Sequence, residues 1–144
     1  MKWKWLLIHH TATGPRETVE SISAMHQRRG WSDIGYHYLL MRDVLGNGHL
    51  KAGRPDTRPG AHCPGWNRVA IGMSVVGYFH PGSPLSEHMS EELYQDVLAA
   101  ATHLCRKYGF AADQVKFHRE CSAKGTACPG SLFPMTRLRA DLKG

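Results

Sequence analysis

The segment from Phe117 to Gly130, FHRECSAKGTACPG, places His118 and Cys128 within one short stretch of chain. A neutral imidazole nitrogen and a thiolate are the two side-chain groups that bind zinc best. Two ligands do not complete a site, and the natural further candidates are His9 and His10, far upstream. If one of them is the third ligand, the two ends of the chain must fold together. A fourth position left to water would then make the site catalytic in type.

The histidine pair ends an apolar run, residues 3–10, that alternates along its length. Both faces of this run become apolar toward its middle, which is typical of a central strand buried on two sides. His9 and His10 would point to opposite faces of such a strand. The pattern favours His9 as the ligand, because it shares a face with Thr11. It leaves His10 for the core or a supporting role, without excluding it.

The following segments alternate irregularly between helical and strand patterns. Residues 16–29 carry apolar side chains at helical spacing, and residues 36–42 are rich in β-forming residues. The dipeptide Asn47-Gly48 predicts a two-residue hairpin turn that pairs this strand with the next segment. The Pro- and Gly-rich residues 54–67 predict a long surface loop.

The second half continues in the same way, with a predicted strand over residues 70–79. Ser90 is the expected N-cap of a long helix, and Gly109 the residue that ends it. A short strand over residues 114–117 would deliver His118, and a last helix would begin near Pro134. These elements predict an α/β fold, with one domain over residues 1–144 and a central mixed sheet flanked by helices.

Composition limits the classes of partner. A length of 144 residues suits one domain, and no apolar stretch reaches the roughly 18 residues that a membrane helix needs, so we expect no membrane insertion. The net charge of +6 favours a polyanionic partner, but the basic residues are scattered and form no nucleic-acid-binding motif. The apolar segment 6–8 is too short for a signal peptide, so we expect synthesis without export and reduced cysteines.

Six motifs together carry a resemblance to a known family. The chain resembles the type 2 N-acetylmuramoyl-L-alanine amidases, a family that includes the amidase-type phage lysozymes and the peptidoglycan recognition proteins. The resemblance implies that fold, and a single Zn²⁺ per chain bound by His9, His118 and Cys128. The motifs are IHHTAT at 8–13, GWSDIGYHYLL at 30–40, AGR at 52–54, GAHCPGWN at 60–67, IGMSVVG at 71–77 and HRECSAKGTACPG at 118–130.

The resemblance also implies catalytic helpers. Tyr36 matches a tyrosine that orients the attacking water or the tetrahedral intermediate. A Lys or Thr two residues before the cysteine is the second helper, and that position is Thr126 here. The loop from His118 to Cys128 is about two residues longer than in the short phage enzymes, so Lys124 is the alternative.

The remaining polar residues of these motifs divide between the cleft and the scaffold. His62 matches a position on the wall of the substrate cleft. Asn67 of the same motif is a second candidate substrate contact, although it also suits a role in supporting the fold. Arg54 suits a fold-supporting role as well. Glu120 is expected to pair with an arginine or to support a ligand. His37 is expected to be a packed structural histidine, and Cys121 is expected to take no part in the metal site.

The resemblance implies hydrolysis of the amide between N-acetylmuramic acid and the L-alanine of bacterial peptidoglycan. A monomeric phage or prophage endolysin, made in the host cytoplasm and then released to the cell wall, is the expected form. The alternatives are a cytoplasmic amidase that recycles wall fragments and a module that binds peptidoglycan without cleaving it. Non-catalytic relatives typically lack the cysteine ligand, and Cys128 is present.

Overall fold

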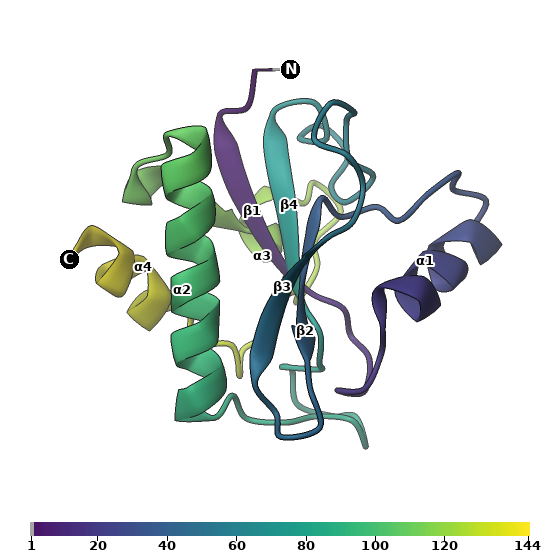
Figure 1. The fold of residues 1–144 in the computed structure, drawn as a ribbon, viewed down its shortest axis with the longest axis vertical. Helices are drawn as coiled ribbons and strands as arrows, with labels where there is room; N and C mark the ends of the chain where they lie inside the picture. Colours follow the sequence, from purple (N-terminus) through teal and green to yellow (C-terminus); the bar gives the residue numbers. More distant parts are fainter. Residues whose placement is uncertain (1) are drawn as a thin grey trace.

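A mixed sheet with helices on both faces forms the centre of the computed structural model, which describes residues 2–144 (Figure 1). The strand order is β3-β2-β4-β1-β5. β1 is parallel to β4 and β5, β2 is parallel to β4, and β3 is antiparallel to β2, so the predicted α/β fold with a mixed sheet is confirmed. The strands are β1 (Trp5–His10), β2 (Tyr38–Arg42), β3 (Gly48–Ala52), β4 (Ala70–Val75) and β5 (Val115–Phe117).

The central position of β1 explains its composition. Leu6, Leu7 and Ile8 are fully buried, as expected for a strand covered on both faces. Leu6 and Ile8 join the main hydrophobic core, while Leu7 packs on the opposite face with Cys63 and Ala70. β1 therefore carries His9 and His10 into the interior at its carboxyl end.

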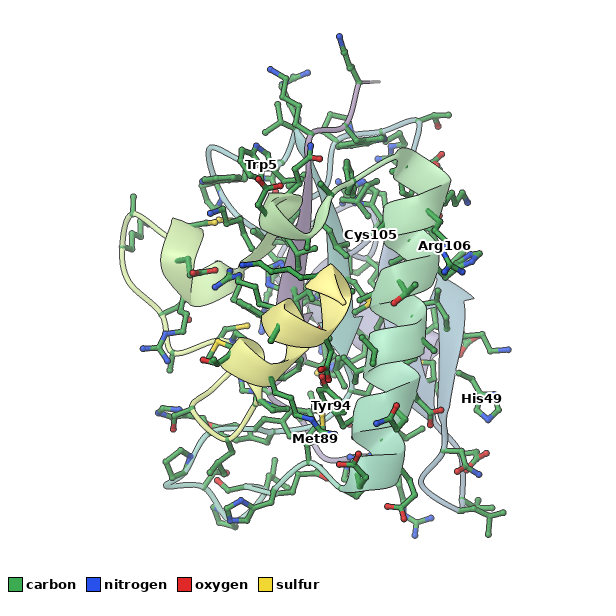
Figure 2. All side chains as sticks on the ribbon, turned by 90° about the vertical axis from the view of Figure 1, so that its left-hand side faces the viewer. Trp5, His49, Met89, Tyr94, Cys105 and Arg106 are labelled. Carbon is green, nitrogen blue, oxygen red and sulfur yellow. The ribbon has the colours of Figure 1, made fainter. Side chains whose placement is uncertain are left out.

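Two helices cover one face of the sheet, α2 (Glu91–Tyr108) and α4 (Met135–Lys143), and Figure 2 views the molecule from their side. The hydroxyl of Ser90 accepts the backbone N–H of Leu93, and Gly109 ends α2 with φ of 75°, so both predicted caps are confirmed. Leu93, Val97 and Leu104 of α2 are fully buried. Helical spacing and caps are local signals, which is why this helix could be predicted closely.

The opposite face is covered by α1 (Val19–Arg28) and by the loop of residues 54–67. Ile22 of α1 packs with Leu39 of β2 and with Val76, on the far side of the sheet from α2 (Figure 1). Cys63 and Trp66 of the loop pack against β1. No helix among residues 2–144 combines the length and the apolarity needed to cross a bilayer.

The hairpin turn differs from the prediction. Arg42 pairs with Gly48, so residues 43–47 form the connection and Gly48 is already in β3. The carboxylate of Asp43 accepts the backbone N–H groups of Leu45 and Asn47, at 2.9 and 3.0 Å, and Gly46 takes the left-handed conformation with φ of 85°. The predicted two-residue Asn47-Gly48 turn is wrong because Asp43 organises a longer turn that closes before it.

The C-terminal segment also contains more regular structure than predicted. A 3₁₀ turn, η1 (Ala112–Gln114), precedes β5, which therefore begins at Val115. The stretch from His118 to Cys128 does not begin as a loop, because α3 (His118–Cys121) forms a single helical turn directly after β5. Glu120 closes this turn by accepting the backbone N–H of Phe117 at 2.9 Å.

Candidate metal centre

His9 and His118 lie next to each other because of the register between β1 and β5. Ile8 pairs with Phe117 in this parallel pair, so the residues that follow them are neighbours. The centroids of the two imidazole rings are 4.5 Å apart. The sheet thus joins residues from the two ends of the chain, as the three-ligand hypothesis required.

Cys128 is brought to the same place by the segment that follows α3. Its carbonyl accepts the backbone N–H of Arg119 at 2.7 Å, and its Sγ accepts that of His10 at 3.3 Å. Gly130 then passes so close to the carbonyl of Phe79 that a Cβ atom would collide with it, and its φ is 99°. Only glycine fits there, which explains the glycine of the CPG motif.

Donor atoms of His9, His118 and Cys128 form a compact cluster, all within 4.8 Å of one another. Cys128 Sγ is 3.9 Å from His9 Nδ1. His10 is not part of this cluster, and its Nδ1 instead accepts the backbone N–H of Phe79 at 3.0 Å. The set that meets is therefore the one predicted, with His10 in a supporting position.

The charge states of the three side chains suit a cation. Burial, reinforced by the neighbouring imidazole of His62, holds the pKa of His9 well below its ordinary value, and burial also lowers the pKa of His118. Both rings are therefore neutral at pH 7, as metal ligands must be. Burial raises the pKa of Cys128 to about 12, so its thiol ionises only beside a positive charge. Two imidazoles and one such thiol fit zinc.

The cluster lies in a cavity of about 400 Å³. Tyr36, His62 and Thr126 border it, whereas Lys124 and Asn67 do not. Lys124 is exposed on the loop after α3. Of the two candidate helpers in this loop, the structure brings Thr126 to the cluster and leaves Lys124 outside. The cavity is lined by His9, His10, Thr11, Ala12, Arg29, Tyr36, His62, Tyr78, His80, His118, Thr126, Ala127 and Cys128.

Tyr36 lies beside the first of the three ligand candidates, with its ring centroid 5.1 Å from that of His9. Burial of the hydroxyl raises the pKa of Tyr36 to about 12, and the nearby Cys128 adds to this shift. The hydroxyl therefore keeps its proton at neutral pH and remains a hydrogen-bond donor, on a residue that lines the cavity.

The two candidate substrate contacts of the 60–67 motif are both engaged within the protein. His62 hydrogen-bonds to His9 and to the carbonyl of Ala70, at 2.9 and 3.0 Å. Asn67 Oδ1 accepts the backbone N–H groups of His62 and Cys63, at 2.8 and 2.9 Å. These two contacts hold the backbone of the loop in place, so they support the fold-supporting role that was considered for Asn67.

The other polar residues have structural contacts. Glu120 pairs with Arg139 at 2.6 Å, which confirms the expected arginine partner. The guanidinium of Arg54 donates to three backbone carbonyls, and His37 bonds to the backbone of Gly72 and Arg58. Cys121 packs beside Leu7 and Cys63 and is not part of the donor cluster.

No role was predicted from the sequence for Arg29, Tyr78 or His80, which also line the cavity. Arg29 is the C-cap of α1, and its guanidinium lies 5.6 Å from the centre of the Trp31 ring. Tyr78 and His80 follow β4 in a turn-rich segment. The neighbouring Trp31 was a possible signal for Arg29, whereas nothing local distinguishes Tyr78 and His80 from other loop residues.

A family model described as N-acetylmuramoyl-L-alanine amidase matches residues 1–131. The endolysin of Escherichia phage T7 is 30% identical over 126 residues, covering 86% of this chain and 78% of the relative. Peptidoglycan-recognition protein SC1a/b of Drosophila simulans is 32% identical over 135 residues, covering 88% and 68%. The solved structure of N-acetylmuramoyl-L-alanine amidase LysC from Clostridium intestinale URNW superimposes with a TM-score of 0.82 and 30% identity, covering 99% and 86%.

Fold and site together define an α/β domain with a His-His-Cys donor cluster at the carboxyl end of its central strand. The chain belongs to the N-acetylmuramoyl-L-alanine amidase family, which confirms the resemblance seen in its motifs.

Proposed function

We propose that this chain is a zinc-dependent N-acetylmuramoyl-L-alanine amidase that hydrolyses the amide between N-acetylmuramic acid and L-alanine in bacterial peptidoglycan. The convergence of His9, His118 and Cys128 in one cavity, with donor atoms within 4.8 Å of one another, carries this proposal. An ion held by three such ligands would lower the pKa of a bound water to about 7 and polarise an amide carbonyl.

The chain's own groups would supply the rest of the chemistry. The two neutral imidazoles and the Cys128 thiolate would hold the ion, and the protonated Tyr36 hydroxyl would orient the attacking water or donate to the developing oxyanion. Thr126, at the wall of the same cavity, supplies a second donor. Neither group acts as a covalent nucleophile, and the raised pKa of Cys128 also argues against such a role for its thiol.

We further propose an endolysin role, with synthesis in the host cytoplasm, release to the cell wall and cytolysis. The similarity to the endolysins of phages T7 and T3 supports this role. A net charge of +6 favours retention on an acidic wall. A recycling amidase would differ in substrate size, since it would act on short soluble fragments and not on intact walls.

The proposal is tested by incubating the protein with purified cell walls and counting new L-alanine amino termini. We expect turnover that stops when a chelator removes the metal, returns with Zn²⁺, and is absent in Cys128→Ala. Cys121→Ser is the matched control on the same segment and should retain turnover. Full activity of metal-free protein or of Cys128→Ala would refute the zinc mechanism. Binding to walls without new termini would identify a binding module, and cleavage of short fragments alone would favour recycling.

A further inference from the structure

His62 joins His9 to the sheet through a chain of two hydrogen bonds. His62 Nδ1 is 2.9 Å from His9 Nε2, and His62 Nε2 is 3.0 Å from the carbonyl oxygen of Ala70. Both nitrogens of His62 are therefore engaged, and its side chain is buried with an exposed fraction of 8%. A ring bonded in this way has no nitrogen left for a substrate.

The direction of each hydrogen bond follows from the groups involved. A carbonyl oxygen only accepts, so His62 Nε2 carries a proton and donates it to Ala70. Among the described residues no carboxylate bonds to His62, and a buried imidazolium without a counter-charge is strongly disfavoured. His62 is therefore neutral, its Nδ1 holds a lone pair, and His9 Nε2 must be the donor between the two rings.

The consequence appears at the other nitrogen of His9. If Nε2 carries the proton of the neutral ring, Nδ1 holds the lone pair. His9 Nδ1 is also the atom that lies 3.9 Å from Cys128 Sγ, on the side of the donor cluster. The hydrogen-bond chain thus leaves the ligating lone pair on the side where the three donors meet.

The surroundings of His62 form a slot fitted to one imidazole ring. A Cβ atom on Gly72 would lie 2.8 Å from Cγ and Cδ2 of His62, and one on Gly60 would lie 2.9 Å from its Nε2. Both glycines therefore leave room that the ring fills. Asn67 fixes the backbone at the same point by accepting the N–H of His62. The ring is held from several sides, which suits a group whose orientation matters.

We propose that His62 is a positioning residue that holds His9 in the tautomer protonated at Nε2 and so presents its Nδ1 lone pair to the metal. This inference rests on the proposed zinc site. His62 would therefore act in metal binding, and not as the substrate contact that was expected from the sequence. Losing an outer partner of a metal-bound histidine typically weakens metal affinity or activity by roughly 10–100-fold.

Two substitutions of similar shape separate the hydrogen bond from packing. His62→Asn retains an acceptor near the position of Nδ1, whereas His62→Leu has none. We expect zinc affinity to fall by roughly 10–100-fold in His62→Leu and to recover most of this loss in His62→Asn. His37→Leu is the matched control, because His37 is also a buried histidine bonded on both nitrogens but does not bond to His9. It should bind zinc as the unsubstituted protein does.

Nitrogen-15 NMR of the histidine rings in metal-free protein reads the tautomer directly. We expect His9 protonated at Nε2 in the unsubstituted protein and in His37→Leu, and a mixture of tautomers in His62→Leu. A His9 ring protonated at Nδ1 in the unsubstituted protein, or undiminished zinc affinity in His62→Leu, would overturn the inference. Failure of the unsubstituted protein to bind zinc would instead count against the proposed function, which the metal-free tautomer measurement does not require.

Discussion

The hydroxyl oxygen of Thr126 accepts the backbone N–H of Cys128, with 3.2 Å between the two heavy atoms. An accepting hydroxyl still has its own proton to donate, and Thr126 borders the cavity that holds the three candidate ligands. The same hydrogen bond fixes the hydroxyl relative to Cys128. The geometry therefore favours Thr126 over Lys124 as the second donor to an oxyanion.

Replacing Thr126 should reduce catalysis without releasing the metal. We expect Thr126→Val, which has the same shape but no hydroxyl, to lower kcat by roughly 10²–10³-fold, the usual effect of removing one oxyanion donor. Thr126→Ser should retain most of the activity. Steady-state hydrolysis of purified walls, with zinc content measured on the same samples, checks this.

Lys124→Ala supplies the contrasting variant, because the exposed Lys124 side chain lies outside the cavity. Its kcat should stay close to the parent value, because the exposed Lys124 side chain does not line the cavity. If Lys124→Ala lost activity while Thr126→Val kept it, the assignment of the helper would have to be reversed.

Tyr36→Phe should leave the fold and zinc content intact and lower kcat by roughly 10²–10³-fold. The reason is that burial keeps the Tyr36 hydroxyl protonated, with a pKa of about 12, so that it donates throughout the neutral range. Tyr38→Phe is a suitable control, since the Tyr38 hydroxyl bonds to Tyr108 and Lys107, away from the cavity. Equal losses in both variants would point to a general effect on stability.

The elements that could be predicted from sequence are those with local signals. Ser90 and Gly109 delimit α2 because a cap bonds within one turn of its helix. The order of the strands had no such signal. β1 pairs with β4 and β5, which lie far from it in the sequence, and parallel pairing leaves no turn that reveals its register.

The candidate site shows the same contrast between features with local sequence signals and features that depend on distant parts of the chain. The types of ligand could be predicted from His118 and Cys128 because imidazole and thiolate chemistry is specific. The position of His62 under His9 could not, since it depends on the fold of the 60–67 loop against β1 and β4. The choice between Thr126 and Lys124 needed the structure too, because α3 winds the first four residues of the segment into about 6 Å of helix.

The hairpin offers a test of the corrected turn. Gly46 has φ of 85°, and a Cβ atom there would meet nothing within 4 Å, so Gly46→Ala should cost only the left-handed strain of about 1 kcal/mol. Gly46→Asn should cost less, because asparagine tolerates this conformation. Thermal unfolding measures both, and wall hydrolysis should be unaffected. No loss of stability in Gly46→Ala would contradict the observed turn.

Gly48 is the matched position, since the two-residue turn would have placed it at the tip. In the structure it lies in β3, where a Cβ atom would be 2.9 Å from the Cβ of Asp96 on α2. Gly48→Ala should therefore destabilise through a steric clash, and Gly48→Asn should be worse and not better. Asparagine should thus be tolerated better than alanine at Gly46 and worse than alanine at Gly48. This difference in stability distinguishes the observed turn from the predicted two-residue turn.

The ion pair between Glu120 and Arg139 should stabilise α3 in a pH-dependent way. Burial alone would raise the pKa of Glu120, but the hydrogen bonds from Arg139 and from the Phe117 N–H outweigh it and hold the pKa below its usual value. A lowered folded-state pKa contributes stability above the unfolded value of about 4.3, and this contribution is lost as the pH falls through the folded value.

Glu120→Gln should therefore lower the melting temperature at pH 7 by an amount that shrinks as the pH falls below about 4. The pair is partly exposed, so a loss of about 0.5–1 kcal/mol is expected at low salt, and less at high salt. Because α3 begins with His118, the same variant should also weaken zinc binding slightly, which titration calorimetry measures. A melting difference of the same size at every pH would mean that the loss comes from the fit of the amide in this site and not from the charge of Glu120.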